Sequence, residues 1–161
     1  MARPPAVNAS PLIFLSKTGM VDYLQLAGSR IVVPEAVASE IQRFGPNDSA
    51  AKLLAETSWL EVMSTPPVPS SIQAWDLGPG ESAVLAWCSA EPNTLGIIDD
   101  LSARHCATAF GIPVKGTLGL VLSAKQQGRI PEARPVLEEL RSSGMYLSNR
   151  VLNRALKMVG E

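Results

Sequence analysis

Two adjacent aspartates, Asp99 and Asp100, are the clearest sign of chemistry in this sequence. They directly follow Leu95–Ile98, an apolar run that is typical of a buried strand. Two carboxylates at the end of a buried strand repel each other unless a cation lies between them. Oxygen ligands without a neighbouring His or Cys favour a hard ion, Mg²⁺ or Mn²⁺. Such an ion can lower the pKa of a bound water and neutralise charge on a phosphodiester that is being hydrolysed.

Three further polar side chains fall near the predicted carboxyl ends of strands, where ligands bind in parallel α/β sheets. Asn8 ends the first strand, Glu40 lies on the helix after the second, and Glu81 lies in the first turn of a helix opened by Gly-Pro-Gly. The acidic residues also have ordinary explanations. Glu81 interacts favourably with the helix dipole, either aspartate can cap a helix, and Glu40 can be a solvated helix residue.

The elements that must position these residues follow an alternating pattern. Short β-branched runs alternate with longer segments of helical period, which predicts a parallel sheet wrapped by helices. The strand candidates are Ala6–Asn8, Arg30–Val33, Trp59–Met63, Leu95–Ile98 and Ile112–Lys115.

Helix boundaries are marked by Pro, Gly and capping residues. One helix is predicted to begin with Pro34 at its first position, and a second to run from an N-cap at Asp48 to Thr57. A third is predicted from Pro79 to about Ala90, and a fourth over Ser102–Phe110 with a left-handed cap at Gly111. The Pro- and Ser-rich stretch 66–80 is predicted to be a surface loop. After the fifth strand the pattern is wholly helical, with stops at Gly128 and Gly144 and a last helix capped by Ser148.

Composition indicates one ordinary globular domain over residues 1–161, with residues 116–161 as its helical C-terminal part. The chain is 46% hydrophobic and 18% charged, and its short apolar runs exclude a membrane span and a signal peptide. Cys88 and Cys106 lack zinc-site spacing, so buried reduced thiols in a reducing cytoplasm are the favoured interpretation. Residues 1–102 hold five Lys/Arg against eleven Asp/Glu, whereas residues 103–161 hold nine against four. An acidic pocket beside a basic surface suits a protein that binds a metal and a polyanion, although charged helix faces alone can explain the pattern.

Five segments, taken in order, resemble the PIN-domain family. They are Val7–Ile13, Val33–Val37, Gly80–Val84, Ile98–Arg104 and Gly111–Val114. The following Gly116–Gly119 and the helical tail are similar to a prokaryotic branch that is described as nucleic-acid-binding. The resemblance covers nearly the whole chain and implies a three-layer α/β/α sandwich around a five-stranded, mainly parallel sheet, with extra C-terminal helices.

The resemblance also implies a site. The first acid of the family falls on Asn8, its helix glutamate on Glu40, the next acid on Glu81, and the last on Asp100 with Asp99 beside it. The predicted catalytic residues are therefore Glu40, Glu81, Asp99 and Asp100, and the predicted metal ligands are these four and Asn8. Ser10 matches a small hydroxyl residue that orients the first ligand. Thr117 is a second supporting residue, or an ordinary helix cap, and Arg104 and Lys115 are predicted to contact nucleic acid.

PIN proteins are typically Mg²⁺- or Mn²⁺-dependent ribonucleases, and many are VapC-type toxins held inactive by a small antitoxin. The resemblance thus implies an RNA substrate, an antitoxin partner, a homodimer and a cytoplasmic location. Asn8 departs from the usual Asp and brings no charge, which favours an alternative: a weakened PIN module that binds nucleic acid or a partner protein without cutting. A phosphoacceptor signalling domain fits poorly, because its acid pair is expected after the first strand.

Overall fold

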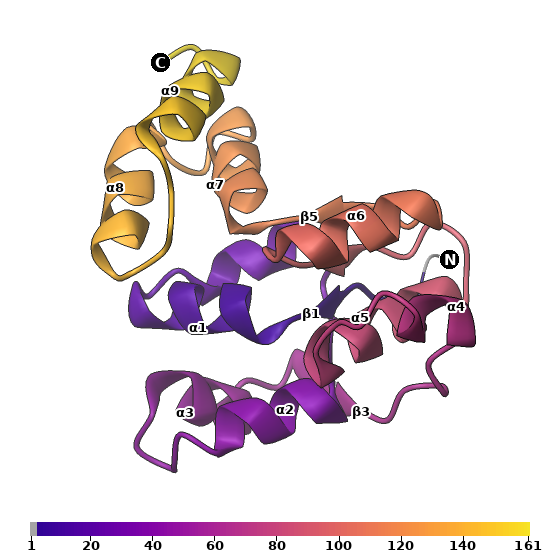
Figure 1. Ribbon diagram of the computed structural model, residues 1–161. Coiled ribbons are helices and arrows are strands. Elements are labelled where there is room, and N and C mark those ends of the chain that lie inside the picture. Colours follow the sequence, from indigo (N-terminus) through magenta and orange to yellow (C-terminus); the bar gives the residue numbers. More distant parts are fainter. Residues whose placement is uncertain (1–2) are drawn as a thin grey trace.

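A computed structural model describes residues 3–161, and its centre is a five-stranded sheet in the order β3-β2-β1-β4-β5 (Figure 1). All neighbouring strands are parallel, which confirms the predicted α/β class. The strands are β1 (Ala6–Val7), β2 (Ile31–Pro34), β3 (Leu60–Met63), β4 (Gly96–Ile97) and β5 (Val114–Lys115). Four of the strands are shorter than the runs that predicted them, and β2 has the predicted length but is shifted by one residue.

Helices cover the sheet on both faces. They are α1 (Ala9–Lys17), the 3₁₀ helix η1 (Val21–Leu26), α2 (Glu35–Gln42), α3 (Ser49–Glu56), α4 (Ser70–Gln73), α5 (Pro79–Ser89), α6 (Leu101–Ala109), α7 (Thr117–Gln126), α8 (Arg134–Ser142) and α9 (Asn149–Met158). The predicted caps are confirmed: Asp48 accepts from two backbone N–H groups of α3, Ser148 accepts from α9, and Gly111 has a φ of +68°.

Three predictions about the helices were wrong. Pro34 is the last residue of β2, because its ψ of 146° keeps it extended, and α2 begins at Glu35. The predicted loop 66–80 contains the short helix α4, which is held to the protein by the buried Ile72. Helix α6 begins at Leu101, one residue before the predicted Ser102. The segment 9–26, for which the sequence analysis gave no assignment, forms α1 and η1.

The direction of the chain reverses between β1 and β4. From β1 the chain moves outward to β2 and β3 through α1–α3, and it then returns through α5 to β4 and continues through α6 to β5. Parallel crossovers are right-handed, so the two directions place these helices on opposite faces. Ligands bind outside the carboxyl ends of the strands at such a reversal. The fold therefore places a crevice beside the ends of β1 and β4.

The apolar side chains form two clusters. The larger one packs the sheet against its helices, and its fully buried members include Leu12, Ile31 and Ile97. The smaller one joins α7, α8 and α9, which stand together, apart from α2–α5, in Figure 1. Helix α7 contributes Leu120 to the first cluster and Val121 to the second, so it connects the two. The C-terminal helices are thereby fixed beside α1 and the ends of the strands.

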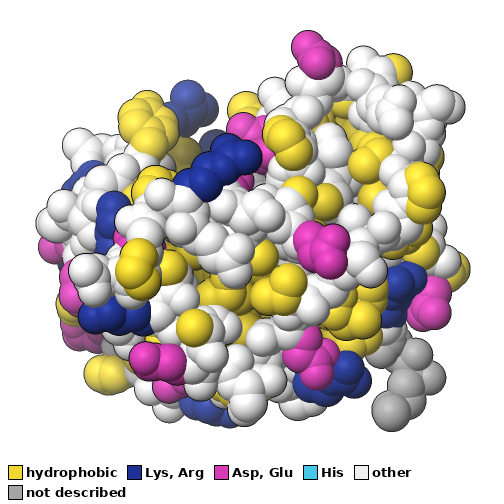
Figure 2. Space-filling model, turned by 90° about the horizontal axis from the view of Figure 1, so that it is seen from below, with side chains coloured by type: hydrophobic (Ala, Val, Ile, Leu, Met, Phe, Trp, Pro, Cys, Tyr) yellow, Lys and Arg dark blue, Asp and Glu magenta, His cyan; other side chains and the backbone are white. Residues whose placement is uncertain are grey.

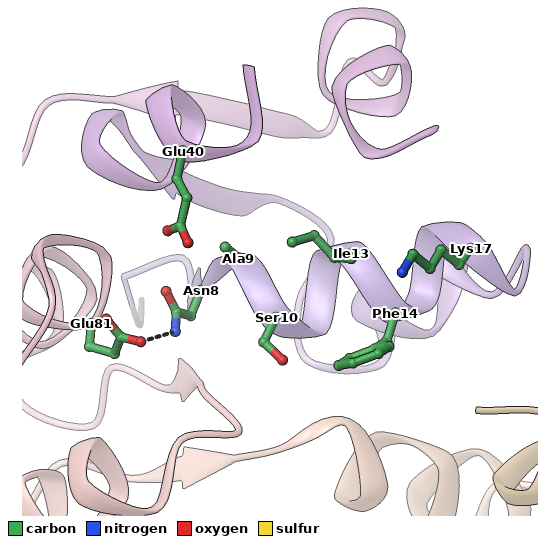
Figure 3. A pocket seen from close by; sticks show the side chains of 8 residues that line it. All are labelled: Asn8, Ala9, Ser10, Ile13, Phe14, Lys17, Glu40 and Glu81. Carbon is green, nitrogen blue, oxygen red and sulfur yellow. Dashed lines mark hydrogen bonds between the residues drawn. The ribbon is translucent and has the colours of Figure 1, made fainter. Parts of the chain in front are cut away.

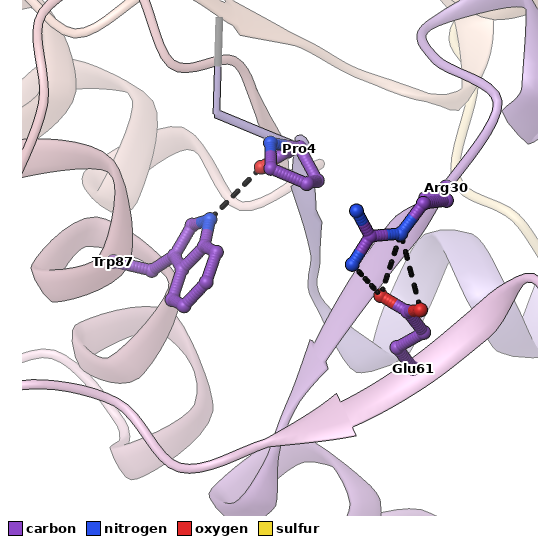
Figure 4. A network of polar contacts seen from close by, with 4 residues as sticks. All are labelled: Pro4, Arg30, Glu61 and Trp87. Carbon is purple, nitrogen blue, oxygen red and sulfur yellow. Dashed lines mark hydrogen bonds and ion pairs between the residues drawn. The ribbon is translucent and has the colours of Figure 1, made fainter.

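Polar contacts also connect elements around the sheet. The indole Nε1 of Trp87 donates to the carbonyl oxygen of Pro4 at 2.9 Å, and the guanidinium of Arg30 binds the carboxylate of Glu61 at 2.7 Å (Figure 4). Cys88 and Cys106 are buried free thiols, as expected. Burial raises the pKa of Cys88 to about 12 and also raises the pKa of Cys106.

The surface carries a mixture of charged and hydrophobic side chains. Charges of both signs are scattered among hydrophobic side chains on the face that Figure 2 shows. Among residues 3–161, no helix is both long and apolar enough to cross a membrane.

Candidate active site at the ends of β1 and β4

The predicted site residues from the first and fourth strands lie side by side. The backbone N–H of Asn8 donates to the carbonyl oxygen of Ile97 at 2.9 Å, so the end of β1 is fixed against the end of β4. Asn8 is the N-cap residue before α1, and Asp99 and Asp100 lead from β4 into α6. Glu81 reaches the same place from the first turn of α5 and Glu40 from α2 (Figure 3).

Asn8 is the central residue of this arrangement. Its side chain is 3% exposed, and its Nδ2 donates to Oε1 of Glu81 at 3.2 Å. An Asn at a helix N-cap normally accepts a hydrogen bond from the first turn of that helix, but the Asn8 side chain makes no such bond. Its Oδ1 is buried and has no hydrogen-bond partner. An unpartnered buried acceptor is costly, so the position of this oxygen requires an explanation.

Gly80 explains the space in front of that oxygen. A Cβ at Gly80 would lie 3.0 Å from Oδ1 of Asn8 and 3.3 Å from Oε2 of Glu40. Two acceptor oxygens therefore face the same small space, which exists because residue 80 has no side chain. Rotating the amide by 180° would exchange its partners and leave the oxygen facing the carboxylate of Glu81. In either orientation the oxygens need a proton, a water or a cation between them.

Asp99 is held by hydrogen bonds from two directions. Its Oδ1 accepts from the backbone N–H of Thr117 at 2.7 Å, and its Oδ2 accepts from the hydroxyl of Thr117 at 2.7 Å and from that of Ser10 at 3.3 Å. Thr117 is fully buried as the first residue of α7, whose N-terminal dipole also favours a carboxylate. Asp99 therefore joins β4 to the C-terminal helices. Ser10 binds Asp99, and not the predicted first ligand Asn8.

Asp100 has the role of a cap. Its Oδ2 accepts from the backbone N–H of Ala103 at 2.9 Å, and its side chain is exposed at the start of α6. One of the two aspartates is thus the N-cap that the sequence analysis allowed for. Its second oxygen remains available at the edge of the crevice.

The two predicted nucleic-acid contacts differ in their surroundings. Arg104 donates through its Nη1 to the carbonyl oxygen of Ile98 at 3.3 Å, and no ion pair within residues 3–161 involves it. Gly116 permits this approach, since a Cβ there would lie 2.7 Å from Nη1. Lys115 is turned along α7, where its Nζ donates to the hydroxyl of Ser123 at 2.8 Å. Arg104 is therefore the better placed of the two to receive a phosphate.

Two cavities meet at Asn8. One of about 250 Å³ lies between α1, Glu40 and Glu81. A groove of about 960 Å³ runs from Asn8 and Glu81 past Asp99 to the C-terminal helices.

Comparison with protein families identifies the family of this chain. A family model described as a PIN domain matches residues 5–161. The chain belongs to the PIN domain family. Comparison with curated proteins gave no match. The PIN domain is a nuclease fold that acts on nucleic acids, and its members in general depend on a divalent metal.

The side chains of this PIN domain fit a hard cation by their chemistry. Within residues 3–161, no three His, Cys, Asp or Glu side chains lie together as a metal-binding group. Asn8 is not of those types. Its Nδ2 donates to Glu81, and its buried Oδ1 faces the space over Gly80 that Glu40 also faces, so its oxygen is an additional possible ligand. Oxygen-only donors of this kind suit a hard divalent cation.

Sequence analysis missed the two glycines of the Gly-Pro-Gly turn as parts of the site. A Cβ at Gly78 would lie 2.7 Å from Oε2 of Glu81, and a Cβ at Gly80 would enter the space beside Asn8. The turn was interpreted only as a helix start. A second Gly after the Pro, inside the first turn of a helix, was the available signal, because Gly disfavours helices unless space is needed.

Proposed function

We propose that this PIN domain is a Mg²⁺- or Mn²⁺-dependent endoribonuclease. The observation that carries the proposal is the buried, unpartnered Oδ1 of Asn8, which shares the space over Gly80 with the carboxylate of Glu40. A protein has little reason to direct two acceptors into one space unless a cation or a water binds there. The general nuclease character of the PIN domain makes the cation the preferred occupant.

In this proposal the metal is held by Asn8, Glu40, Glu81 and the two aspartates. A bound Mg²⁺ or Mn²⁺ would lower the pKa of a water and neutralise charge developing on the phosphodiester. The protein's own groups do the positioning. The Nδ2 of Asn8 holds Glu81, while Thr117 and Ser10 hold Asp99.

Arg104 would bind the substrate. Its side chain is half-buried and is held by a backbone carbonyl oxygen, with no carboxylate in an ion pair with it among the described residues. A guanidinium in this state can still form a bidentate pair with phosphate. We therefore assign Arg104 to the phosphate beside the bond that is cut, and Lys115 to a more distant one.

The test is cleavage of a labelled, structured RNA with Mg²⁺, Mn²⁺ or EDTA. Glu40→Gln and Glu81→Gln keep the shape of each side chain and remove its charge, whereas Asp99→Ala would also release α7. Metal-dependent cleavage that falls at least a hundredfold in the Glu variants is expected. Glu138→Gln, an exposed change on α8, is the matched control and should cleave like the unaltered protein.

A second candidate function is favoured by the neutral Asn8 and by the absence of three gathered acids among residues 3–161. It is a PIN module that binds RNA or a partner protein without cutting. The same experiment separates the two, because a well-folded protein that retains RNA but does not cleave it in either metal supports binding alone.

We further propose that the nuclease is the toxin of a toxin–antitoxin pair, works in the reducing cytoplasm and forms a homodimer. The toxin role rests on the family resemblance, and it requires a small protein encoded nearby that binds the chain and blocks cleavage. The dimer rests partly on exposed apolar residues of the last helices outside the groove, such as Met158. Light scattering that gives a monomer at micromolar concentration would exclude the dimer.

A further inference from the structure

The groove of about 960 Å³ has two chemically different ends. Its inner end carries Asn8, Glu81, Asp99 and Arg104, which belong to the candidate active site. Its outer end is apolar and is formed by α7, the α8–α9 connection and α9. The apolar lining residues there are Leu118, Leu122, Met145, Tyr146, Leu147 and Val151. The inner end also holds Asp100, so three carboxylates lie there with Arg104. With the cation of the proposed function bound among them, an occupant that fills the whole groove combines a phosphate at Arg104 with apolar surface.

Tyr146 is the unusual residue of the outer end. It is 90% exposed, whereas its neighbours Met145 and Leu147 are directed into the second apolar cluster. The connection that carries it is well held: the guanidinium of Arg141 donates to the carbonyl oxygen of Leu147, and Ser148 caps α9. A backbone held by these contacts thus presents an aromatic ring to solvent at the rim of the groove.

Two more exposed apolar side chains line the same groove. Leu101, 65% exposed, follows the aspartates on the inner side, and Val151, 44% exposed, lies on α9. Single exposed apolar residues are common, but these three line one groove together. Because the groove is continuous with the candidate active site, a bound substrate is the occupant to consider first.

We infer that the groove binds an unpaired nucleotide next to the phosphate that is cut, with its base stacked on Tyr146 and its phosphate on Arg104. This inference rests on the proposed ribonuclease function. A single strand alternates anionic phosphates with flat apolar bases, as the groove requires, and bases stack on aromatic side chains regardless of sequence. In a duplex the bases are stacked inside and cannot reach the ring. The new element of this inference is therefore the role of Tyr146, which would hold the unpaired base beside the candidate active site.

The test is binding of a short single-stranded RNA that contains the fluorescent base 2-aminopurine, measured in EDTA so that the RNA stays intact. Binding should quench the fluorescence. Tyr146→Ala should weaken binding by about 5- to 150-fold and abolish the quenching. Tyr146→Trp should retain both, because it keeps an aromatic face. Phe44→Ala removes an exposed aromatic ring outside the groove and should change neither.

Several results would overturn the inference. They are no RNA binding by the unaltered protein, equally tight binding of the single strand by Tyr146→Ala, and an equal loss of affinity for a duplex of the same sequence when Tyr146 is replaced by Ala. A change of oligomeric state in Tyr146→Ala, seen by light scattering, would instead assign the surface to a second copy of the chain. Cleavage in Mg²⁺ or Mn²⁺ is a separate readout. Tyr146-dependent binding without cleavage refutes the proposed function alone, and cleavage that ignores Tyr146→Ala refutes this inference alone.

Discussion

Replacing Asn8 by Asp should make the folding of this PIN domain depend on a divalent cation. The Nδ2 of Asn8 donates to Glu81 at 3.2 Å, and the Oδ1 shares the space over Gly80 with Glu40. A carboxylate at position 8 would lose the donated bond and would face two other carboxylates. Without a cation, Asn8→Asp should therefore destabilise the fold.

The magnitude follows from the geometry. A hydrogen bond to a charged group contributes about 1.5–3 kcal/mol. Two unit charges at the 3.2 Å of the present Asn8–Glu81 contact repel by roughly 5 kcal/mol at an effective dielectric constant of 20. Glu81 is half-exposed and can turn away, so the repulsion is an upper limit. The expected loss in EDTA is about 2–5 kcal/mol of unfolding free energy, or about 4–20 °C in Tm for a chain of this size.

The assay is thermal unfolding of the unaltered protein and of Asn8→Asp in EDTA and in Mg²⁺ or Mn²⁺. A cation at a hundred times its Kd restores about 2.7 kcal/mol, because it binds the folded state. Asn153→Asp makes the same chemical change at an exposed position on α9 and should show neither the loss nor the rescue.

Two results would refute this reasoning. If Asn8→Asp is as stable as the unaltered protein in EDTA, the Glu81 carboxylate does not depend on the donated bond. If the variant is destabilised but gains no more from Mg²⁺ or Mn²⁺ than Asn153→Asp does, the space over Gly80 does not hold a cation.

Three further changes test other parts of the structure. Gly80→Ala should lower the affinity for Mn²⁺ at least tenfold, because its Cβ would lie 3.0 Å from the oxygen of Asn8, and Tm should change little. Electron paramagnetic resonance measures the affinity, and an unchanged value would contradict the proposed role of the space over Gly80. Thr117→Val removes a buried hydroxyl that donates to Asp99 and should cost about 1.5–3 kcal/mol in urea unfolding, whereas Thr117→Ser should keep most of the stability. Burial raises the pKa of Cys88 to about 12, so between about pH 9 and 12 the unfolded thiol ionises first and stability falls with rising pH by up to about 1.4 kcal/mol per unit. Cys88→Val should lose that part of the pH dependence, and an unchanged slope would show that this thiol does not cause it.

Much of the fold was predictable because its signals are local. Each strand of the buried sheet is a short β-branched run, and each predicted cap is one polar or Gly residue at a fixed position. Helix α1 was not predicted because Leu12–Leu15 is apolar on every side, and such a run does not distinguish a buried strand from a buried helix. Helix α4 depends on the burial of Ile72 by distant residues, which a local pattern cannot express.

The location of the candidate site was predictable, but its internal contacts were not. Parallel topology brings the ends of β1 and β4 together whatever residues stand there. The roles of the two aspartates depend on the position of the first residue of α6, and a shift of one residue would change them. Because α6 begins at Leu101, Asp100 becomes the cap and Asp99 turns to Thr117. Helix boundaries are the least certain part of a prediction from sequence, so only the structure distinguishes the role of Asp99 from that of Asp100.

Asn8 also indicates how the site remains folded before any ligand arrives. A third carboxylate between Glu40 and Glu81 would bind a cation more tightly and would make the empty site unstable. The amide donates its N–H to Glu81 and keeps one buried oxygen beside Glu40. For the proposed metal site, we therefore expect a lower affinity for the cation and a fold that is stable without it. The unaltered protein should therefore gain little Tm from Mg²⁺, and Asn8→Asp should gain much more. Equal gains would show that the glutamates, and not residue 8, control the coupling between cation binding and folding.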